Sequence, residues 1–418
     1  MNIILFTSAA NTSGGSRQAL YLAQGLVEQG HTVLFFVPGH SKLPELAPAA
    51  GFWRSFPAQG SWKREIETAM AAMAANGNPV VVHAFHNAAV KRAAWWGLFW
   101  RKRAVVVAHR GVIFRPHNPL PYWSPGMDAF LVNSKACGKI LRGIGLSPRR
   151  LFYVPNCVPD ARLAAATDPA SLRASLGIPA GAPLFLSIGG NKPYKGVREL
   201  ILAFASAFPA SSGDSSHCVE ANELRRELRP HPPGPCRPWP RRTGSDSAPT
   251  IDPNESHRSP GSAVATEKPH LVILGLSHEL WLPLVNDTGI ADRIHCLGKT
   301  ENVGSYLSAA SVFVLPSLSE SMPNTLLEAV RAGLPCIGTN VGAVPDILSG
   351  TDNACGLVVP PGDVPALAAA MRRMADEPEL RASFARAAAL AGEAYRPEKR
   401  IALAQSIYEE LLRRKGLM

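Results

Sequence analysis

Two glutamates in the last third of the chain have a spacing that could serve ligand binding. Glu320 and Glu328 are separated by seven residues in "SLSESMPNTLLEAVRAGLP", residues 317–335. A helix is expected to open close to Pro323, because proline favours the first helical turn. Glu320 then lies in the loop before this helix, and Glu328 lies inside it.

The start of the same predicted helix is a candidate anion site. The backbone amides near Met322, Asn324 and Thr325 would have no partner within the helix, and the helix dipole favours negative charge beside them. A phosphate bound there would leave both glutamates free to accept hydrogen bonds from sugar hydroxyls. The simpler alternative is a solvated carboxylate pair, because a bare E-x7-E arrangement occurs often by chance.

Two further loops could contact a phosphate. In "LFLSIGGNKPYKGVREL", Lys195 stands between an apolar run and a helical pattern, where it could neutralise a departing phosphate, and Lys192 lies on the same loop. In "NTSGGSRQAL", Gly14 and Gly15 would let the backbone approach a ligand closely at a helix start. A surface lysine and a plain turn are the respective alternatives.

Histidines and metal ligands offer fewer candidates. In "AVVVAHRG", His109 is expected at the end of a strand, whereas His83 in "VVVHAFH" falls inside a strand pattern typical of a core residue. A lone histidine is more often structural than catalytic. No D-x-D motif and no histidine–carboxylate cluster with metal spacing occurs, so no metal and no cofactor are expected.

Composition limits the classes of protein that the chain can belong to. Its 418 residues are 46% hydrophobic and 18% charged, which predicts a globular protein of about two domains. The net charge of +11 favours an anionic partner, but the basic residues are dispersed and no nucleic-acid motif is present. Seven dispersed cysteines fit a reducing cytoplasm. No apolar run approaches the roughly 18 residues of a transmembrane helix, and a strand rather than a signal peptide is expected at the start.

The elements that must position these residues follow an alternating pattern. Short apolar runs alternate with helical patterns, as in "NIILFTS", "SRQALYLAQGLVEQG" and "HTVLFFV", which predicts parallel β–α–β units. This α/β rhythm predicts two doubly wound, Rossmann-like domains, at residues 1–160 and 161–395, followed by a helix at 396–418. Residues 211–268, rich in Ser, Pro, Gly and Arg, are predicted to be a disordered low-complexity insertion in the second domain. Ligands bind such sheets at the carboxyl ends of their strands, where the candidate residues fall.

The stretch "KRAAWWGLFWRKR", residues 91–103, places aromatic side chains between basic clusters. In a helix, Trp96, Phe99 and Trp100 would share one face, with Trp95 off to one side. Such a face could bind an anionic membrane surface, because tryptophan favours the interface and basic residues favour anionic lipid. The alternative is a helix whose aromatic residues fill the core of the first domain.

The motifs around the two glutamates resemble a known family. E-x7-E together with "VFVLPSLSES", "EAVRAGLP" and "NVGAVPDIL", in this order, resembles the signature of the retaining glycosyltransferases of family 4, which have the two-domain GT-B fold. The resemblance covers nearly the whole chain except the insertion. It implies transfer of a sugar from a nucleotide-diphosphate sugar to a hydroxyl acceptor with retention of configuration. The acceptor would be a glycan or a lipid-linked glycan of cell-envelope polysaccharide synthesis.

The same resemblance implies roles for single residues. Glu320 would contact the donor sugar, Glu328 the ribose of the nucleotide, and Lys195, which matches a K-G motif, the leaving phosphate. The loop with Gly14 and Gly15 would face the interdomain cleft, and His109 would contact the donor sugar from the first domain. The first domain would carry the acceptor, and its segment 91–103 would attach the protein peripherally to the inner face of the membrane.

Two positions depart from the family, and two other functions are compatible with the fold. Gly190 stands where the family usually has an arginine, so Lys192 is the candidate replacement on that loop. Cys157 replaces the usual glycine of the interdomain "VPNCVP" segment. A nucleotide-sugar epimerase would need no acceptor, and a non-catalytic protein that binds nucleotides or nucleic acid would show no turnover.

Overall fold

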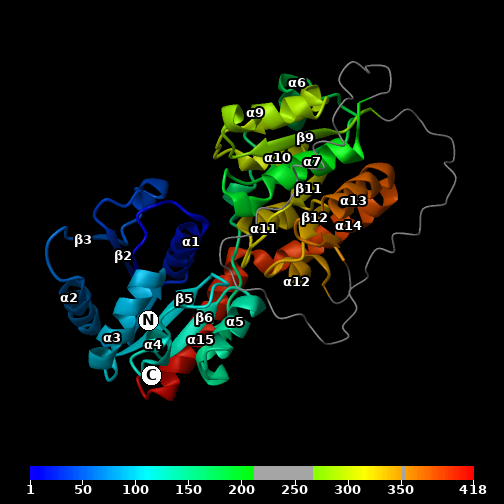
Figure 1. The fold of residues 1–418 in the computed structure, drawn as a ribbon. Coiled ribbons are helices and arrows are strands. Elements are labelled where there is room, and N and C mark those ends of the chain that lie inside the picture. Colours follow the sequence, from blue (N-terminus) through cyan, green and yellow to red (C-terminus); the bar gives the residue numbers. More distant parts are fainter. Residues whose placement is uncertain (211–266, 351–353) are drawn as a thin grey trace.

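The chain folds into two α/β domains that lie side by side (Figure 1). The computed structural model describes residues 1–210, 267–350 and 354–418. The predicted insertion 211–268 therefore lies outside the described residues, except for its last two. Both termini lie in the first domain (Figure 1).

The first domain is built on a parallel sheet of seven strands in the order β3-β2-β1-β4-β5-β6-β7. Its strands are β1 (Asn2–Thr7), β2 (Thr32–Pro38), β3 (Trp53–Phe56), β4 (Val80–Phe85), β5 (Ala104–Arg110), β6 (Ala129–Val132) and β7 (Leu151–Tyr153). Its helices are α1 (Gly14–Glu28), α2 (Trp62–Ala74), α3 (Asn87–Trp100), α4 (Leu120–Trp123) and α5 (Lys135–Arg142). The predicted alternation of strands and helices is confirmed, except that the short edge strand β3 was not predicted.

Helices cover both faces of this sheet, so its central strands β1, β4 and β5 are almost entirely buried. Ile4 and Phe6 pack toward one face with residues of α2, α3 and α5. Ile3 and Leu5 alternate with them and pack toward the other face, against α1. The sheet is therefore the buried centre of a three-layer domain.

The second domain has a parallel sheet of six strands in the order β10-β9-β8-β11-β12-β13. Its strands are β8 (Leu184–Ile188), β9 (His270–Leu274), β10 (Ile294–Leu297), β11 (Val312–Leu315), β12 (Cys336–Thr339) and β13 (Gly356–Val359). Its helices are α6 (Pro169–Ser175), α7 (Val197–Ala207), α9 (His278–Asp287), α10 (Val303–Ala309), α11 (Asn324–Arg331), α12 (Val344–Leu348), α13 (Val364–Asp376) and α14 (Pro378–Gly392). Two separate apolar clusters, one on each face, form its core.

The last helix, α15 (Pro397–Arg414), returns to the first domain. Its Ile401, Tyr408 and Leu411 are buried in the same cluster as the strands of the first sheet. Gly25 of α1 permits this packing, because a Cβ atom there would lie 1.8 Å from the Cδ1 of Ile401. The sequence predicted the helix but left open which domain it covers.

Helix α3 confirms the predicted helix within 91–103 but presents a different face to solvent. Trp100 is buried and donates from Nε1 to Glu67, and Trp96 is partly buried and stacks on Phe6 with ring centroids 6.0 Å apart. Trp95 and Phe99 are instead 51% and 67% exposed. Trp96, Phe99 and Trp100 therefore do not form one exposed face, because Trp100 is buried and Trp96 is partly buried against Phe6 of the sheet.

Candidate active site

Each sheet reverses its strand order at one place, and the candidate residues gather at these two places. In the second sheet the reversal lies between β8 and β11, and in the first sheet between β1 and β4. Parallel sheets bind ligands in the crevice outside the carboxyl ends of the strands at such switch points. Lys195 follows β8 and Glu320 follows β11, as the sequence predicted.

Lys195 and Glu320 form an ion pair at the second-domain switch point. Nζ of Lys195 donates to Oε1 of Glu320 over 2.6 Å, and the hydroxyl of Ser317 donates to the same oxygen over 3.1 Å. Both side chains are largely buried, which strengthens their attraction relative to a surface pair. The structure thus brings together a cation and a carboxylate from positions far apart in the sequence.

Gly196 holds the two loops of this switch point in contact. Its φ of 68° lies in the left-handed region, and a Cβ atom there would lie 2.0 Å from the backbone oxygen of Pro316. The amide of Leu318 also donates to the backbone oxygen of Tyr194 over 2.8 Å. The glycine after Lys195 is therefore a geometric requirement for the Lys195–Glu320 pair.

Glu328 lies inside α11, as predicted, and is buried. Its Oε1 accepts from Nε of Arg162 over 3.0 Å, while its Oε2 is buried without a hydrogen-bond partner in the described part of the chain. Burial raises the pKa of Glu328, and the neighbouring Arg162 opposes that rise. A small cavity beside it is also lined by Arg17, Tyr21 and Asn324. An unpaired carboxylate oxygen next to a polar cavity can accept a hydrogen bond from a ligand hydroxyl.

The start of α11 abuts the first domain and the interdomain segment. The Oδ1 of Asn324 accepts from Nδ2 of Asn156 over 2.7 Å and from Nε2 of Gln18 over 3.4 Å. Met322 is buried, and Thr325 follows in the first turn, to which Pro323 provides no side-chain cap. The start of α11 is thus linked through Asn324 to α1 and to the interdomain segment.

Ser321, in the loop before α11, contacts the first domain. Its hydroxyl donates to Oδ1 of Asn133 over 2.8 Å and lies 3.0 Å from the hydroxyl of Ser134. Both partners follow β6 of the first domain. Ser321 therefore links the two domains through side-chain hydrogen bonds and does not cap α11.

The predicted glycine loop lies between the two domains. Ser13 caps α1 and accepts from the amide of Ser16, so the helix begins at Gly14. A Cβ atom on Gly14 would lie 2.5 Å from Nδ2 of Asn324, and one on Gly15 would lie 3.1 Å from Nε2 of His86. Any larger residue would therefore push against the second domain or against the end of β4.

His109 is at the end of β5, as predicted, and is held among other rings. Its ring stacks on Phe85 with centroids 5.2 Å apart, and its Nδ1 is buried with no partner in the described residues. Burial, with smaller contributions from Arg400 and His86, lowers the pKa of His109 to about 3, so the ring is neutral at pH 7. His83 is a core residue, as the strand pattern indicated, and its Nδ1 lies 2.6 Å from the hydroxyl of Tyr408.

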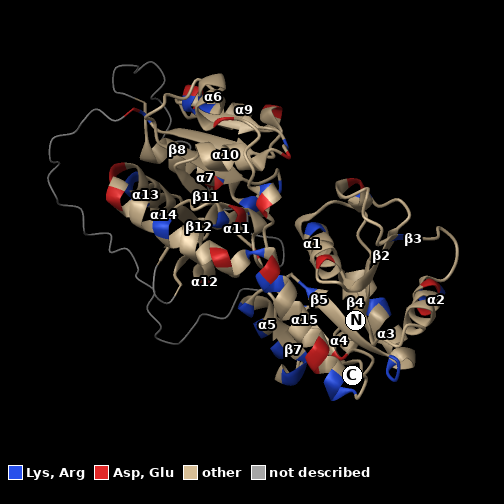
Figure 2. Cartoon of the chain, turned by 180° about the vertical axis from the view of Figure 1, so that it is seen from behind, with Lys and Arg blue, Asp and Glu red and all other residues tan. Residues whose placement is uncertain are grey.

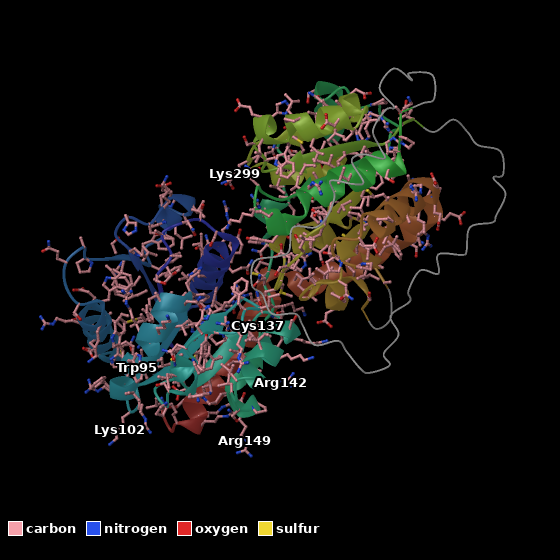
Figure 3. The ribbon with its side chains drawn as sticks, viewed as in Figure 1. Trp95, Lys102, Cys137, Arg142, Arg149 and Lys299 are labelled. Carbon is pink, nitrogen blue, oxygen red and sulfur yellow. The ribbon has the colours of Figure 1, made fainter. Side chains whose placement is uncertain are left out.

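The loop that lacks the family arginine carries other basic residues nearby. Lys192 is exposed, with Nζ 5.8 Å from the ring centroid of Tyr194, and Gly190 has no atom within 4 Å of its Cβ position. Lys299 follows β10 and lies on the side of the second domain that faces the first (Figure 3). Lysines on neighbouring loops are therefore candidates to replace the missing arginine.

Sequence reasoning missed three residues that the structure places at this site. Arg162 pairs with Glu328, and Arg17 of α1 pairs across the cleft with Glu301 over 2.8 Å. Their partners lie more than a hundred positions away, so no local pattern marks them. His86 was overlooked because it follows a strand without any motif around it.

The described residues contain neither a metal-binding cluster nor a membrane-spanning helix. No group of three or more His, Cys, Asp and Glu side chains there could hold a metal ion. No helix in the ranges 1–210, 267–350 and 354–418 is long and apolar enough to cross a membrane.

Two family models together match more than half of the chain. Residues 12–162 match the model described as Glycosyltransferase Family 4, and residues 262–377 match the one described as Glycosyl transferases group 1. The chain belongs to the family 4 glycosyltransferases. The resemblance drawn from the motifs around Glu320 and Glu328 is thereby confirmed.

Curated relatives of this glycosyltransferase align over part of their length. N-acetyl-α-D-glucosaminyl L-malate synthase of Bacillus anthracis is 36% identical over 133 residues, which are 32% of this chain and 34% of that protein. Lipopolysaccharide core biosynthesis mannosyltransferase LpsB of Rhizobium meliloti is 32% identical over 130 residues, which are 31% of this chain and 37% of that protein. The aligned residues thus span about a third of the length of these relatives.

Solved structures show the fold of this glycosyltransferase over almost its whole length. The crystal structure of Anabaena Alr3699/HepE in complex with UDP has a TM-score of 0.71 at 15% identity and covers 98% of this chain and 99% of that chain. WaaB, a lipopolysaccharide outer core galactosyltransferase in its apo form, has a TM-score of 0.65 at 13% identity and covers 98% and 100%. The predicted GT-B fold is confirmed.

Proposed function

We propose that this protein transfers a sugar from a nucleotide-diphosphate sugar to a hydroxyl acceptor, with retention of anomeric configuration. The observation that carries the proposal is the Lys195–Glu320 pair of 2.6 Å, which lies at the switch point of the second sheet. The glycine loop of the first domain contacts the start of α11 beside it. A diphosphate between these elements would meet a lysine and the free amides of two helix starts.

Lys195 and Glu320 would contact different parts of the donor, the diphosphate and the sugar. A transition state with oxocarbenium character leaves negative charge on the departing diphosphate, and Lys195 can stabilise that charge. Glu320, released from Lys195, would accept hydrogen bonds from hydroxyls of the donor sugar. His109, neutral at pH 7, would contact the same sugar from the first domain. Closing the cleft would exclude water, which competes with the acceptor.

Glu328 is the proposed contact for the nucleotide ribose. Its Oε2 is buried without a partner among the described residues, and ribose hydroxyls are donors that would satisfy it. Arg162 would keep the carboxylate charged despite its burial, because the pair lies at 3.0 Å. UDP is the first nucleotide to test, since the Anabaena neighbour was crystallised with UDP.

For the acceptor we propose a glycan or a lipid-linked glycan presented at the inner face of a membrane. Two relatives are named for lipopolysaccharide core biosynthesis, LpsB and LpsD of Rhizobium meliloti. Trp95 and Phe99 of α3 and Trp123 of α4 are each more than half exposed, and α3 and α4 are in contact. Figure 2 shows lysines and arginines at the end of the first domain that carries α5, β7 and the carboxyl terminus. Aromatic and basic side chains together favour an anionic lipid surface.

Calorimetry with UDP, GDP and ADP tests the nucleotide part of the proposal. We expect one of the three to bind, and Glu328→Gln to weaken that binding by about ten- to a hundredfold, because a hydrogen bond to a charged group is lost. Asp346→Asn, which changes an exposed carboxylate elsewhere in the second domain, is the control. Equal affinity of Glu328→Gln and wild type would refute the ribose role.

Incubation with the donor alone separates transfer from the related reactions. A transferase should release nucleotide slowly without acceptor and rapidly with acceptor, and the sugar should remain the original epimer. Rapid formation of an epimer without acceptor would refute transfer.

A further inference from the structure

The first domain has a switch point of its own, and a histidine stands at it. The reversal lies between β1 and β4, and His86 is the first residue after β4. The loop after β1 leads to Gly14 and Gly15, on the other side of the same crevice. His86 therefore occupies in the first domain the kind of place that Glu320 occupies in the second.

The backbone of His86 has a conformation that a histidine rarely adopts. Its φ of 68° and ψ of 152° fall in a region that is essentially restricted to glycine, and it is the one residue other than glycine with positive φ in ranges 1–210, 267–350 and 354–418. A glycine would remove this strain. Strained residues of this kind cluster at ligand sites, which makes the imidazole a candidate ligand contact.

The ring is held in one orientation. Its Nδ1 lies 2.7 Å from the hydroxyl of Thr7, a buried residue, and that hydroxyl also accepts from the amide of Ala9 over 3.0 Å. A hydroxyl can donate or accept, so this contact survives whether the ring is neutral or protonated. The ring's other nitrogen, Nε2, lies beside Gly15, at 3.1 Å from the position that its Cβ would take. Nε2 is thus the nitrogen within reach of a ligand on the glycine loop.

Two positive charges that the family resemblance places at the diphosphate are missing or paired in this chain. Gly190 replaces the family arginine, and Lys195 is shared with Glu320. We propose that His86 is a donor-binding residue whose Nε2 hydrogen-bonds the diphosphate of the nucleotide sugar and which takes up a proton when that diphosphate binds. This inference rests on the proposed function, because it assigns a further contact to the same substrate.

The charges around His86 determine the direction of the pH effect. The titratable group that interacts with His86 from a neighbouring strand is His109, at the end of β5. Of the other neighbouring elements, α1 carries Arg17, whose charge is paired with Glu301, α3 carries the exposed Lys91 and Arg92, and α11 places the uncharged Asn324 beside Gly14. Burial lowers the pKa of His86, so the ring is neutral in the free protein at pH 7. A bound dianion favours the charged ring and raises that pKa. UDP affinity should therefore increase as the pH falls from 8 toward 6.

Calorimetry of UDP binding in two buffers of different ionisation enthalpy measures the proton taken up. The variants are His86→Gly, which keeps the backbone conformation, and His86→Gln, which keeps a polar side chain. His117→Gln, which changes an exposed histidine, is the matched control. UDP also carries a titrating phosphate, so the difference between wild type and His86→Gly reports on His86 alone.

We expect wild type to take up a fraction of a proton more than His86→Gly and to bind UDP about ten- to a hundredfold more tightly at pH 6.5. His86→Gly should unfold at the same temperature as wild type or higher, because it relieves strain; a purely structural residue would instead lose stability. Equal affinity and equal proton uptake in wild type and His86→Gly would overturn this inference alone. Failure of wild type to bind any nucleotide diphosphate would overturn the proposed function as well.

Discussion

At the scale of single residues, Lys195 and Glu320 neutralise each other's charge in a largely buried site. Nζ of Lys195 and Oε1 of Glu320 lie 2.6 Å apart, so each group has a partner of opposite charge. Removing one partner leaves the other charge buried and unpaired. Both single changes should therefore lower activity, and each should also cost stability.

We predict that Lys195→Ala lowers turnover by about a hundred- to a thousandfold, the effect typical of losing one group that stabilises transition-state charge. Glu320→Gln should lower turnover more than it lowers nucleotide affinity, because the proposed contact of Glu320 is with the sugar rather than with the nucleotide. Initial rates with saturating donor, alongside calorimetry with UDP, measure both effects.

The matched control is Lys135→Ala, which breaks an exposed pair with Asp346 at 3.1 Å between the two domains. An exposed pair contributes about 0 to 1 kcal/mol, so this variant should behave as wild type. Full turnover of Lys195→Ala would remove Lys195 from the proposed mechanism.

His109 carries a prediction about acid stability. Its folded pKa of about 3 lies below the unfolded value of 6.5, so below pH 6.5 the unfolded chain binds a proton that the folded chain does not. Stability should therefore fall as the pH drops from about 6.5 toward 3. At pH 5 this histidine alone accounts for up to about 2 kcal/mol.

Urea unfolding of His109→Gln at pH 7.5 and pH 5 measures that contribution. The variant should lose less stability between the two pH values than wild type does, while His117→Gln should lose as much as wild type. An identical loss in all three proteins would show that the pKa of His109 is the same in the folded and the unfolded chain.

At the scale of elements, α3 shows how a helix can serve both a core and a surface. Trp100 is buried in the first domain, whereas Phe99 is exposed, with Nζ of Lys63 only 4.0 Å from its ring centroid. Trp95 and Lys102 lie on the part of the first domain that points away from the second (Figure 3). The exposed aromatic side chains thus have basic residues beside them.

We predict that wild type sediments with anionic liposomes at low salt and is released at high salt, because screening weakens the attraction between exposed charges. Changing Trp95 and Phe99 to Ser should reduce the bound fraction, as should changing Lys91, Arg92, Arg101, Lys102 and Arg103 to Gln. Leu390→Ser is the control, since Leu390 is 70% exposed on α14 of the second domain. Equal binding by all variants would refute attachment through α3.

At the scale of the whole molecule, the chain crosses between the domains twice, and ion pairs hold the crossings together. Arg331 of α11 contacts Asp160, after the first crossing, and Glu393, before the second. The guanidinium of Arg400, on α15, is buried and donates to the backbone oxygen of Gln18 over 2.6 Å. Closure of the cleft would thus bend two neighbouring segments at one place, as a hinge requires.

The connection between α7 and β9 carries the last prediction. The strands β8 and β9 are adjacent and parallel, so α7 between them completes a β–α–β unit that needs only a few residues to return to the sheet. Replacing 211–266 by a linker of about eight residues should leave UDP affinity and unfolding temperature nearly unchanged. An insoluble product, or one that no longer binds UDP, would show that the segment is part of the folded domain.

The sequence by itself determined the two parallel sheets, the placement of Lys195 and Glu320 at strand ends and of Glu328 within a helix, and the family. These features are local: a periodic apolar pattern shows that an element is buried, and a motif has its signal within a few dozen residues. The edge strands β3 and β13 escaped prediction because neither is a continuous buried apolar run: only Phe56 is buried in β3, and only Gly356 and Val359 are buried in β13.

Only the tertiary structure decided which residues meet. The contact of Arg162 with Glu328, the place of His86 beside Gly15 and the return of α15 to the first domain all join positions far apart in the chain. The exposed face of α3 was likewise decided by the sheet beneath it. A local pattern shows that a helix or strand buries one face, but the order of the strands and the docking of the domains determine which partner covers that face.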